Sequence, residues 1–397
     1  MWNGSRTPII RCTFDRMIEE HIAKHQDMSY NNRYCIIMAG GTANHFWPVS
    51  RESRPKQFLD IAGTGDSFIR STYERFSRIV PSKNILVVTL TRFSYLVRAQ
   101  IPELPEENLL LEPYARNTAP CIAYATYCIL KRDPNATVIA TPADHIIKDE
   151  ARFKSAMLKM MDYAENNSAL MTLGIHPTEP DTSYGYIQAT GGRESAGDDT
   201  PLKVKTFTEK PDKALAEVFC KTGEFYWNSG IFAWKASVIR EEMEKYIPDV
   251  TTLFTGWEDA LGSDKEQTFL EKVYTDCPKV SIDYGVMEKT DRAWLYCGDF
   301  GWSDIDSWES LYSNMDNKTA DGNIVFTDKY LADGNDGSML VCGDKKKLYA
   351  IKGLKDYLVV DTGDVLLICP KDDKNFKDFI SCLLYTSPSP RDLSTSR

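Results

Sequence analysis

A glycine pair followed by several cationic side chains is the first feature of this sequence that suggests chemistry. The stretch CIIMAGGTANHFWPVSRESRPKQFL (35–59) runs from an apolar, strand-like segment into Gly40 and Gly41, and then reaches Arg51 and Lys56. Glycine lets backbone N–H groups approach an oxyanion closely and fixed cations neutralise it, so the pattern suits phosphate binding. The spacing matches neither G-x-G-x-x-G nor G-x-x-x-x-G-K-[ST], which excludes dinucleotide and P-loop sites. A tight strand-to-helix turn with a solvated basic face is the structural alternative.

Carboxylates in two distant segments suit a divalent metal beside phosphates. Asp144 follows a predicted strand in TPADHII, at the end where a parallel sheet presents its ligands. The segment GDFGWSDIDSW (298–308) offers Asp304 in a loop before a helix. Two such carboxylates meeting at one Mg²⁺ would supply the oxygen ligands that a nucleotide–metal complex needs. Helix capping is the alternative, by Asp144 in the first segment and by Ser303 or Asp304 in the second.

The elements that must position these side chains alternate between apolar strands and helices. The runs 34–40, 84–89 and 136–144 are predicted to be strands buried on both faces, and 119–132 and 151–167 are predicted to be helices. This βαβ order indicates an α/β fold with a mainly parallel, doubly wound sheet and right-handed crossovers. Ligands are then expected at the carboxyl ends of the strands.

The C-terminal part of the chain has a different texture. After residue 320, short β segments such as GNIVF, SMLVCG and DYLVVDTGDVLLICP alternate with Gly/Asp turns. This pattern predicts a small all-β module built as a few solenoid coils. We therefore expect a catalytic domain over 28–318 and a β module over 319–381.

Both ends of the chain look foreign to this fold. The first predicted strand begins a few residues after Met28, so residues 1–27 either precede the true start or form an amphipathic helix at FDRMIEEHIAKH. The stretch CLLYTSPSPRD resembles the translation of a sequencing-library adapter, and its Ser/Pro-rich continuation is of a disordered type. We expect 1–27 to be a non-native or disordered extension and 382–397 to be an artefactual tail.

The composition limits the classes of partner. With 47 Lys and Arg against 57 Asp and Glu, the net charge of -10 argues against a nucleic-acid or anionic-membrane surface, so an anionic ligand must meet a local cationic cluster. Ten cysteines occur without a CxxC pair, which indicates reduced thiols in a cytoplasmic protein. No apolar run approaches the ~18 residues of a membrane span, and the N-terminus lacks the apolar region of a signal peptide.

Eight short motifs in a fixed order carry a resemblance to a known family. Between residues 33 and 370 the sequence resembles the monofunctional bacterial mannose-1-phosphate guanylyltransferases, also called GDP-mannose pyrophosphorylases. No single motif is specific, whereas the ordered set is. The motifs are GG…WPVSRESRPKQFL, LEPYARNTAPCIAYA, TPADHII, GIHPTEPDTSYGYI, FTEKPD, YWNSGIFAW, SIDYGVMEK and GWSDIDSW.

The resemblance implies a Rossmann-like, GT-A-like nucleotidyltransferase fold whose C-terminal module is similar to a left-handed β-helix. It also implies the reaction of GTP with α-D-mannose 1-phosphate to give GDP-mannose and pyrophosphate, with Mg²⁺ as cofactor and a homodimer as the candidate assembly. The sugar phosphate would attack the α-phosphorus in line, without a covalent enzyme intermediate. Positioning and charge neutralisation serve such a step, because the attacking phosphate is already ionised. In agreement, the five histidines show no triad-like context.

By the same resemblance, the glycine-opened segment would hold the phosphates. Lys56 would stabilise negative charge at the α-phosphorus, with His45 and Arg51 in the same loop as further catalytic candidates. Gly40 and Gly41 would bring the backbone close to the nucleotide.

Two further groups of residues follow from matching motifs. Glu112, Arg116 and Asn117 lie in the segment that resembles the base and ribose contact region, where a carboxylate would accept hydrogen bonds from guanine. A helix cap at Asn117, ahead of a helix that begins near Pro120, explains that segment structurally. Asp144 and Asp304 would be the Mg²⁺ ligands.

For the sugar phosphate, the resemblance implies contacts from four motifs. Gly185 would lie against the mannose ring, where a side chain would clash, and Tyr184 would pack beside it. Glu209 would accept hydrogen bonds from sugar hydroxyls, and Lys210 would pair with the 1-phosphate. The residues expected at the sugar are Tyr184, Gly185, Glu209, Lys210, Asn228 and Asp283.

The glycine-opened loop departs from the family pattern G-G-x-G-[ST]-R-[LF]-x-P-x-S-R. Ala43, Asn44 and His45 occupy its fourth to sixth positions, so the third glycine and the loop arginine are missing. Histidine is shorter than arginine and forms no bidentate fork, and the loss of one phosphate clamp would cost roughly two to three decades in rate. The alternatives to an active guanylyltransferase are therefore a catalytically weakened paralogue that binds a nucleotide sugar, and a nucleotidyltransferase for another base or hexose.

Overall fold

The structure is a computed structural model that describes residues 31–380, except 43–44, 192–199, 328, 344–345, 374 and 377. The expected extension 1–27, the expected tail 382–397, and Ala43 and Asn44 of the loop therefore lie outside the described residues. In the part described, no helix combines the length and the apolar composition that crossing a bilayer requires. The eight cysteines in this part are free thiols, as the absence of CxxC pairs predicts.

A nine-stranded sheet forms the centre of the domain, in the order β3-β2-β1-β4-β9-β6-β10-β8-β7. The parallel pairing predicted from the βαβ order is confirmed for β3, β2, β1 and β4. β9 lies antiparallel between β4 and β6, so the other half of the sheet is mixed. The strands span Arg33–Met38 (β1), Ile85–Leu90 (β2), Leu109–Glu112 (β3), Thr137–Pro142 (β4), Leu170–Ile175 (β6), Tyr186–Ala189 (β7), Leu202–Thr208 (β8), Phe225–Lys235 (β9) and Ala293–Cys297 (β10).

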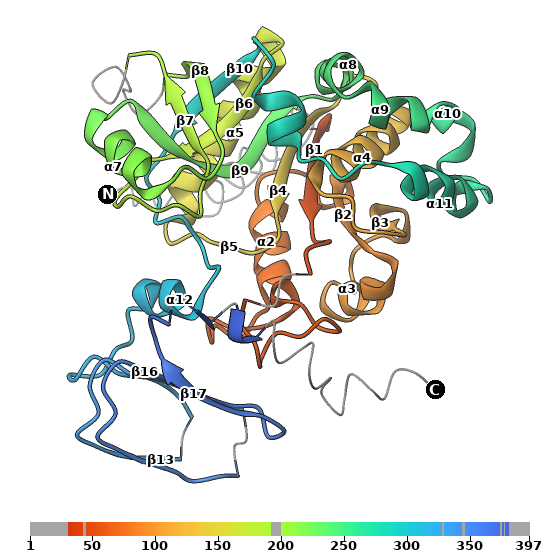
Figure 1. Cartoon of the computed structure of the whole chain (residues 1–397). Coiled ribbons are helices and arrows are strands. Elements are labelled where there is room, and N and C mark those ends of the chain that lie inside the picture. The colour runs from red at the N-terminus through yellow and green to blue at the C-terminus, as the bar shows by residue number, and fades with distance from the viewer. Residues whose placement is uncertain are drawn as a thin grey trace, which may run out of the picture.

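Helices cover both faces of this sheet (Figure 1). Cys35 and Ile37 of β1 pack on one face with α2, α3, α5 and α7, whereas Tyr34 and Ile36 pack on the other with α4 and α8 to α11. Burial on both faces explains why the central strands are continuous apolar runs. The helices span Phe68–Ser77 (α2), Ser94–Gln100 (α3), Thr118–Arg132 (α4), Glu150–Asn167 (α5), Lys213–Thr222 (α7), Ala236–Tyr246 (α8), Pro248–Thr251 (α9), Trp257–Ala260 (α10), Glu266–Asp276 (α11) and Trp308–Asn314 (α12).

The strands and helices predicted between residues 34 and 167 are all present, with ends shifted by at most two residues. Local signals account for these ends. The side chain of Asn117 accepts a hydrogen bond from the backbone N–H of Thr118 at the start of α4, and the side chain of Asp149 caps α5. The α/β class expected from the sequence is thereby confirmed.

The C-terminal module consists of short stacked strands below the domain in Figure 1. β12, β14 and β16 stack in parallel, β13 and β15 form a second parallel pair, and β17 closes the first stack as an antiparallel hairpin with β16. Buried asparagines link successive coils, since the Asn323 side chain donates to Asn335 O and that of Asn335 to Ile351 O, both at 2.9 Å. The strands span Ile324–Phe326 (β12), Tyr330–Asp333 (β13), Met339–Cys342 (β14), Tyr349–Lys352 (β15), Tyr357–Asp361 (β16) and Leu366–Pro370 (β17).

Candidate active site

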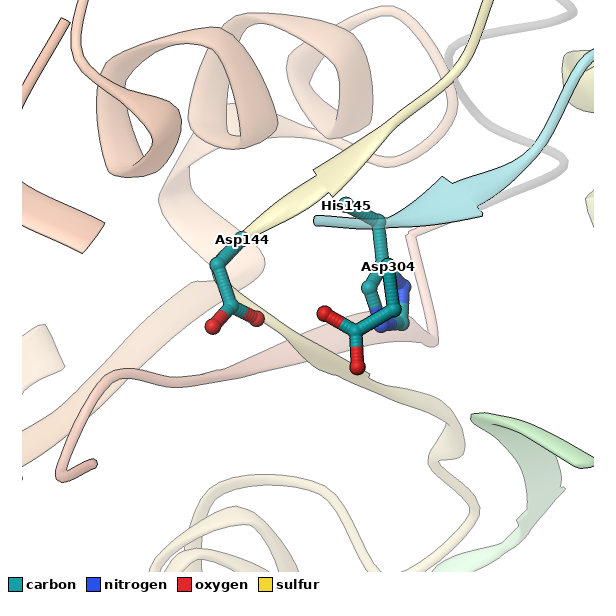
Figure 2. Close-up of side chains that lie close together, drawn as sticks. All are labelled: Asp144, His145 and Asp304. Atoms are coloured by element: carbon teal, nitrogen blue, oxygen red, sulfur yellow. The ribbon is translucent and has the colours of Figure 1, made fainter. Parts of the chain in front are cut away.

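Two short strands bring the carboxylates of Asp144 and Asp304 together. β5 (His145–Ile146) follows β4, and β11 (Ser303–Asp304) pairs with it in the antiparallel sense, with Asp304 opposite His145. Asp144 therefore lies just past the carboxyl end of β4, as the sequence predicts. Figure 2 shows the Asp144 and Asp304 side chains reaching into the same space beside His145.

The capping interpretation of the segment around Asp304 is wrong. The side chain of Ser307 accepts a hydrogen bond from Ser310 N at 3.1 Å and caps α12. Asp304 instead lies in β11, and its carboxylate faces Lys56. The chain thus leaves Asp304 available for chemistry.

Lys56 lies between the two carboxylates. Its Nζ is 3.0 Å from Asp144 Oδ2 and 3.2 Å from Asp304 Oδ1, and it donates a hydrogen bond to Ile305 O at 2.8 Å. Burial alone would lower the pKa of Lys56, but the charges of the two carboxylates raise it above its ordinary value. Burial likewise opposes ionisation of Asp304, yet Lys56 holds its pKa below the usual range. The site therefore carries one fixed cation and two carboxylates.

Asp144, His145 and Asp304 form a group compact enough to hold a metal ion. One ligand atom from each lies within 4.8 Å of the others. His145 is buried, and its Nδ1 accepts a hydrogen bond from Trp302 Nε1 at 3.3 Å. Burial lowers the pKa of His145 despite the adjacent carboxylates, so the ring is neutral and its remaining nitrogen carries the proton. Neither nitrogen then offers a free lone pair, and the two carboxylates fit a hard cation better than the imidazole does.

A cavity of about 300 Å³ opens beside Asp144, toward the glycine pair. All of the residues predicted to contact the nucleotide lie in its wall. These are Gly40, Gly41, Glu112, Arg116 and Asn117, joined by Asp144. The structure therefore brings these predicted nucleotide contacts together beside Lys56 and the two carboxylates that pair with it.

Glu112 is the most deeply buried acid in this wall, with an exposed fraction of 4%. Its Oε1 accepts a hydrogen bond from Tyr274 OH at 2.9 Å. Burial raises the pKa of Glu112 to about 8, although the tyrosine acts in the opposite direction. A Cβ on Gly40 would lie 3.0 Å from Glu112 Oε2, so a side chain at position 40 would crowd this buried acid.

Gly41 has a different part in the turn. A Cβ there would meet no described atom within 4 Å, and neither glycine has a positive φ. The side chain of Gln57 donates to Ala39 O at 2.9 Å and to Gly41 O at 2.8 Å. Gln57 therefore ties the glycine pair to the segment that carries Lys56.

Arg116 and Asn117 have protein partners that shape the cavity wall. Arg116 donates to Tyr274 O at 2.7 Å and to Thr275 O at 2.9 Å, which anchors the loop to the end of α11. Asn117 is the N-cap of α4 and has φ 70°. The structural interpretation of Asn117 as a cap is confirmed, and its presence in the cavity wall follows from that position.

Four of the residues predicted at the sugar form a second cluster. A Cβ on Gly185 would lie 2.7 Å from Glu209 Oε2 and 3.6 Å from the Cβ of Asn228. Asn228 Nδ2 donates to Asp283 Oδ1 at 2.6 Å. Burial raises the pKa of both Glu209 and Asp283, and for Glu209 the negative charge of Asp283 adds to the effect. The cluster offers carboxylate acceptors around a glycine where a Cβ would force the Glu209 carboxylate to move.

Tyr184 links this second cluster to the group formed by Asp144, His145 and Asp304. Its ring packs against Trp227 and Trp302 with centroid distances of 4.9 and 5.5 Å, and its OH donates to Asp304 O at 3.2 Å. Lys210, by contrast, is largely exposed, with its Nζ 4.0 Å from Glu209 Oε1. Lys210 therefore lies in an exposed position at the edge of this second cluster.

Arg51 and His45 are placed differently from the other candidates. Arg51 Nη2 lies 3.2 Å from both carboxylate oxygens of Asp364, in the C-terminal module, and Arg51 does not belong to the described wall of the cavity. The Nδ1–H of His45 donates to Asp306 O at 2.6 Å, beside the Asp304 segment. The structure thus brings His45 near the cluster but directs Arg51 to the module.

Three residues of this region were not predicted from the sequence. Gln57 follows Lys56 directly, so its position next to a predicted site residue could have indicated it. Trp302 and Tyr274 had no such signal, because their partners His145 and Glu112 lie 157 and 162 residues away in the chain.

Comparison with known proteins agrees with this arrangement. Residues 34–321 match the family model described as nucleotidyl transferase. A mannose-1-phosphate guanylyltransferase of Escherichia coli is 36% identical over 355 residues, which are 87% of this chain and 72% of that protein. The alginate biosynthesis protein AlgA of Pseudomonas aeruginosa is 34% identical over 339 residues, covering 85% of this chain and 69% of its own. A crystal structure of a mannose-1-phosphate geranyltransferase from Thermus thermophilus superimposes with a TM-score of 0.77 at 30% identity, covering 89% of this chain and 99% of that one. The chain therefore belongs to the nucleotidyl transferase family, among the mannose-1-phosphate guanylyltransferases.

Proposed function

We propose that this protein makes GDP-mannose and pyrophosphate from GTP and α-D-mannose 1-phosphate. The observation that carries the proposal is the position of Lys56, paired with Asp144 and Asp304 at the end of the cavity that holds the nucleotide candidates. A cation and two carboxylates in such a place suit the transfer of a nucleotidyl group, in which charge neutralisation and positioning lower the barrier.

We propose Mg²⁺ as the cofactor, with Asp144 and Asp304 as its protein ligands. Two carboxylates leave further positions for phosphate oxygens and water, which is the usual arrangement for this ion. When bound, Mg²⁺ would neutralise phosphate charge and orient the phosphate chain. Lys56 would donate hydrogen bonds to the phosphate oxygens while Ile305 O holds its ammonium group in place. The sugar phosphate needs no general base, because it is ionised at neutral pH.

The base and the sugar would be selected by separate acidic side chains. Glu112 lies at the wall of the nucleotide cavity, and an acid there can pair with the donor-rich edge of guanine, which adenine lacks. Gly185 lets the Glu209 carboxylate and Asn228 lie close to the backbone, and the polar groups of these two side chains match sugar hydroxyls. Lys210 at the rim would meet the 1-phosphate of the incoming sugar.

A substrate panel tests this function. Pyrophosphate release would be measured for each nucleoside triphosphate with each hexose 1-phosphate in the presence of Mg²⁺. We expect the highest kcat/KM for GTP with mannose 1-phosphate, and a better pair of another base or hexose would replace the assignment. Binding of GTP without turnover for any pair would instead favour the weakened paralogue. In that case His45→Arg should raise turnover.

Two further expectations remain proposals. The free thiols support a cytoplasmic protein, and we propose that location. A homodimer is proposed from the family resemblance, and sedimentation at several protein concentrations tests it.

A further inference from the structure

The loop that carries Lys56, residues 45–56 and here named the lysine loop, is tied to the C-terminal module by an ion pair. Arg51 Nη2 is 3.2 Å from both oxygens of Asp364, and the two side chains are only 13% and 25% exposed. Arg51 Nε also donates to Pro48 O within the same loop at 2.9 Å. The guanidinium thus links the loop backbone to the module instead of reaching the nucleotide cavity.

Asp364 is held in a defined place by its own turn. It lies between β16 and β17, where Thr362 Oγ1 donates to Asp364 Oδ1 at 2.8 Å and Thr362 N to Val365 O at 3.0 Å. Gly363 has φ 88°, a backbone conformation that glycine adopts more readily than other residues. The module therefore presents a fixed carboxylate to the lysine loop.

A shift of Arg51 would also move Lys56, because backbone hydrogen bonds connect this part of the loop. Arg51 N and Arg54 N each donate to the other's carbonyl oxygen, at 3.1 and 2.9 Å, which closes the loop just before Pro55 and Lys56. Near the start of the loop, Trp308 Nε1 donates to Trp47 O at 3.2 Å. The lysine loop is therefore fixed to α12 near its start and closed on itself just before Lys56.

An apolar cluster also connects the lysine loop to the C-terminal module. Ile305, whose carbonyl oxygen accepts the hydrogen bond from Lys56, has a fully buried side chain. That side chain belongs to one cluster with Phe46 of the lysine loop and with strands of the C-terminal module. The module contributes Ile324, Met339, Leu358, Val360 and Leu367 to this cluster.

We propose that the C-terminal module fixes the position of Lys56, and that Arg51, through Asp364, is the positioning residue of the lysine loop. This inference rests on the proposed function, because it assigns the module a part in holding the lysine that would stabilise the transition state. It reassigns Arg51 from phosphate contact to loop positioning. Since a misplaced Lys56 weakens an interaction made in the transition state, the effect belongs in kcat more than in KM.

The test compares Asp364→Asn with Asp333→Asn in the full-length chain. Asp333 pairs with Lys352 at 2.7 Å in the same module, but both are largely exposed on β13 and β15 and form no part of the cluster at the lysine loop. We expect Asp364→Asn to lower kcat about tenfold, which corresponds to ~1.4 kcal/mol, with KM for GTP changed by less than about twofold. Asp333→Asn should match the wild type in both constants.

Two further measurements separate positioning from general destabilisation. Hydrogen exchange of the peptide 45–58 should be faster in Asp364→Asn than in Asp333→Asn, at equal fractions of folded protein. Each of the single variants Arg51→Asp and Asp364→Arg should have a lowered kcat. The double variant that combines them should have a kcat close to that of the wild type. Such recovery would show that Arg51 and Asp364 act as a pair, and the exchange of 45–58 shows whether the pair acts on the loop.

The results that would overturn the inference are distinct from failure of the proposed function. Equal kcat for the two asparagine variants, or equal exchange of 45–58, would show that Asp364 does not position the loop. A wild type without pyrophosphate release for any substrate pair would refute the proposed function instead. The exchange comparison would then still decide whether the module holds the lysine loop.

Discussion

Replacing Lys56 with methionine removes the cation at the centre of the site and keeps an unbranched apolar stem in its place. The variant loses the contacts to Asp144 Oδ2 at 3.0 Å and to Asp304 Oδ1 at 3.2 Å, and the hydrogen bond to Ile305 O. Lys56 is 7% exposed, so bulk water cannot readily replace its ammonium group. For catalysis we expect kcat to fall by about 10²–10³, or roughly 2.7–4 kcal/mol, the range for one preorganised donor at a developing charge.

The same variant makes a second prediction, for stability. Without Lys56 the carboxylates of Asp144 and Asp304 face each other unpaired, which destabilises the metal-free protein. Their side chains are 22% and 32% exposed, so solvent shares the cost, and we expect about 1–3 kcal/mol rather than the ~3–5 kcal/mol of a fully buried pair. Mg²⁺ should then stabilise Lys56→Met more than the wild type, because no ammonium group competes for the two carboxylates.

Initial rates of pyrophosphate release and thermal unfolding with and without Mg²⁺ measure both effects. Lys148→Met is the matched control, because Lys148 pairs with Asp316 at 3.0 Å in an exposed position. The control should keep the wild-type kcat and the wild-type response to Mg²⁺. The reasoning is refuted if Lys56→Met stays within about threefold of the wild-type kcat, or if Mg²⁺ stabilises both proteins equally.

Three further substitutions test other parts of the site. Asp304→Asn should lower the Mg²⁺-dependent rate at least about a hundredfold and raise the Mg²⁺ concentration needed for half-maximal rate, and an unchanged Mg²⁺ requirement would count against its role as a ligand. Gly185→Ala places a Cβ 2.7 Å from Glu209 Oε2, so KM for mannose 1-phosphate should rise about tenfold while KM for GTP stays unchanged; equal changes in both would contradict the sugar assignment. Burial raises the pKa of Glu112 from 4.5 to about 8, so the folded protein keeps a proton that the unfolded chain has lost, and stability falls as pH rises through this window. Urea unfolding between these pH values should show a loss on the order of 1.4 kcal/mol per pH unit in the wild type relative to Glu112→Gln, and parallel profiles would exclude it.

Much of the fold was predictable because the signals are local. β1, β2 and β4 are mostly apolar and buried along nearly their whole length, and α4 and α5 begin at capping side chains that the sequence displays. A parallel sheet also makes the carboxyl end of each strand a place for ligands, so Asp144 was predictable as a site residue from its position after β4. The antiparallel entry of β9 was not predictable, because pairing partners depend on the global path of the chain.

The sequence alone determined the residue types of the site and the strands that present them, since apolar runs, glycines and charges are properties of short segments. Only the tertiary structure decided which charges meet. Arg51 and Lys56 are five residues apart in one cationic loop, yet Lys56 pairs with Asp304 from 248 residues away, and Arg51 pairs with Asp364 from 313 residues away. A charged side chain pairs with an opposite charge that the folded chain brings within a few ångströms. The local sequence does not determine which distant residue that is.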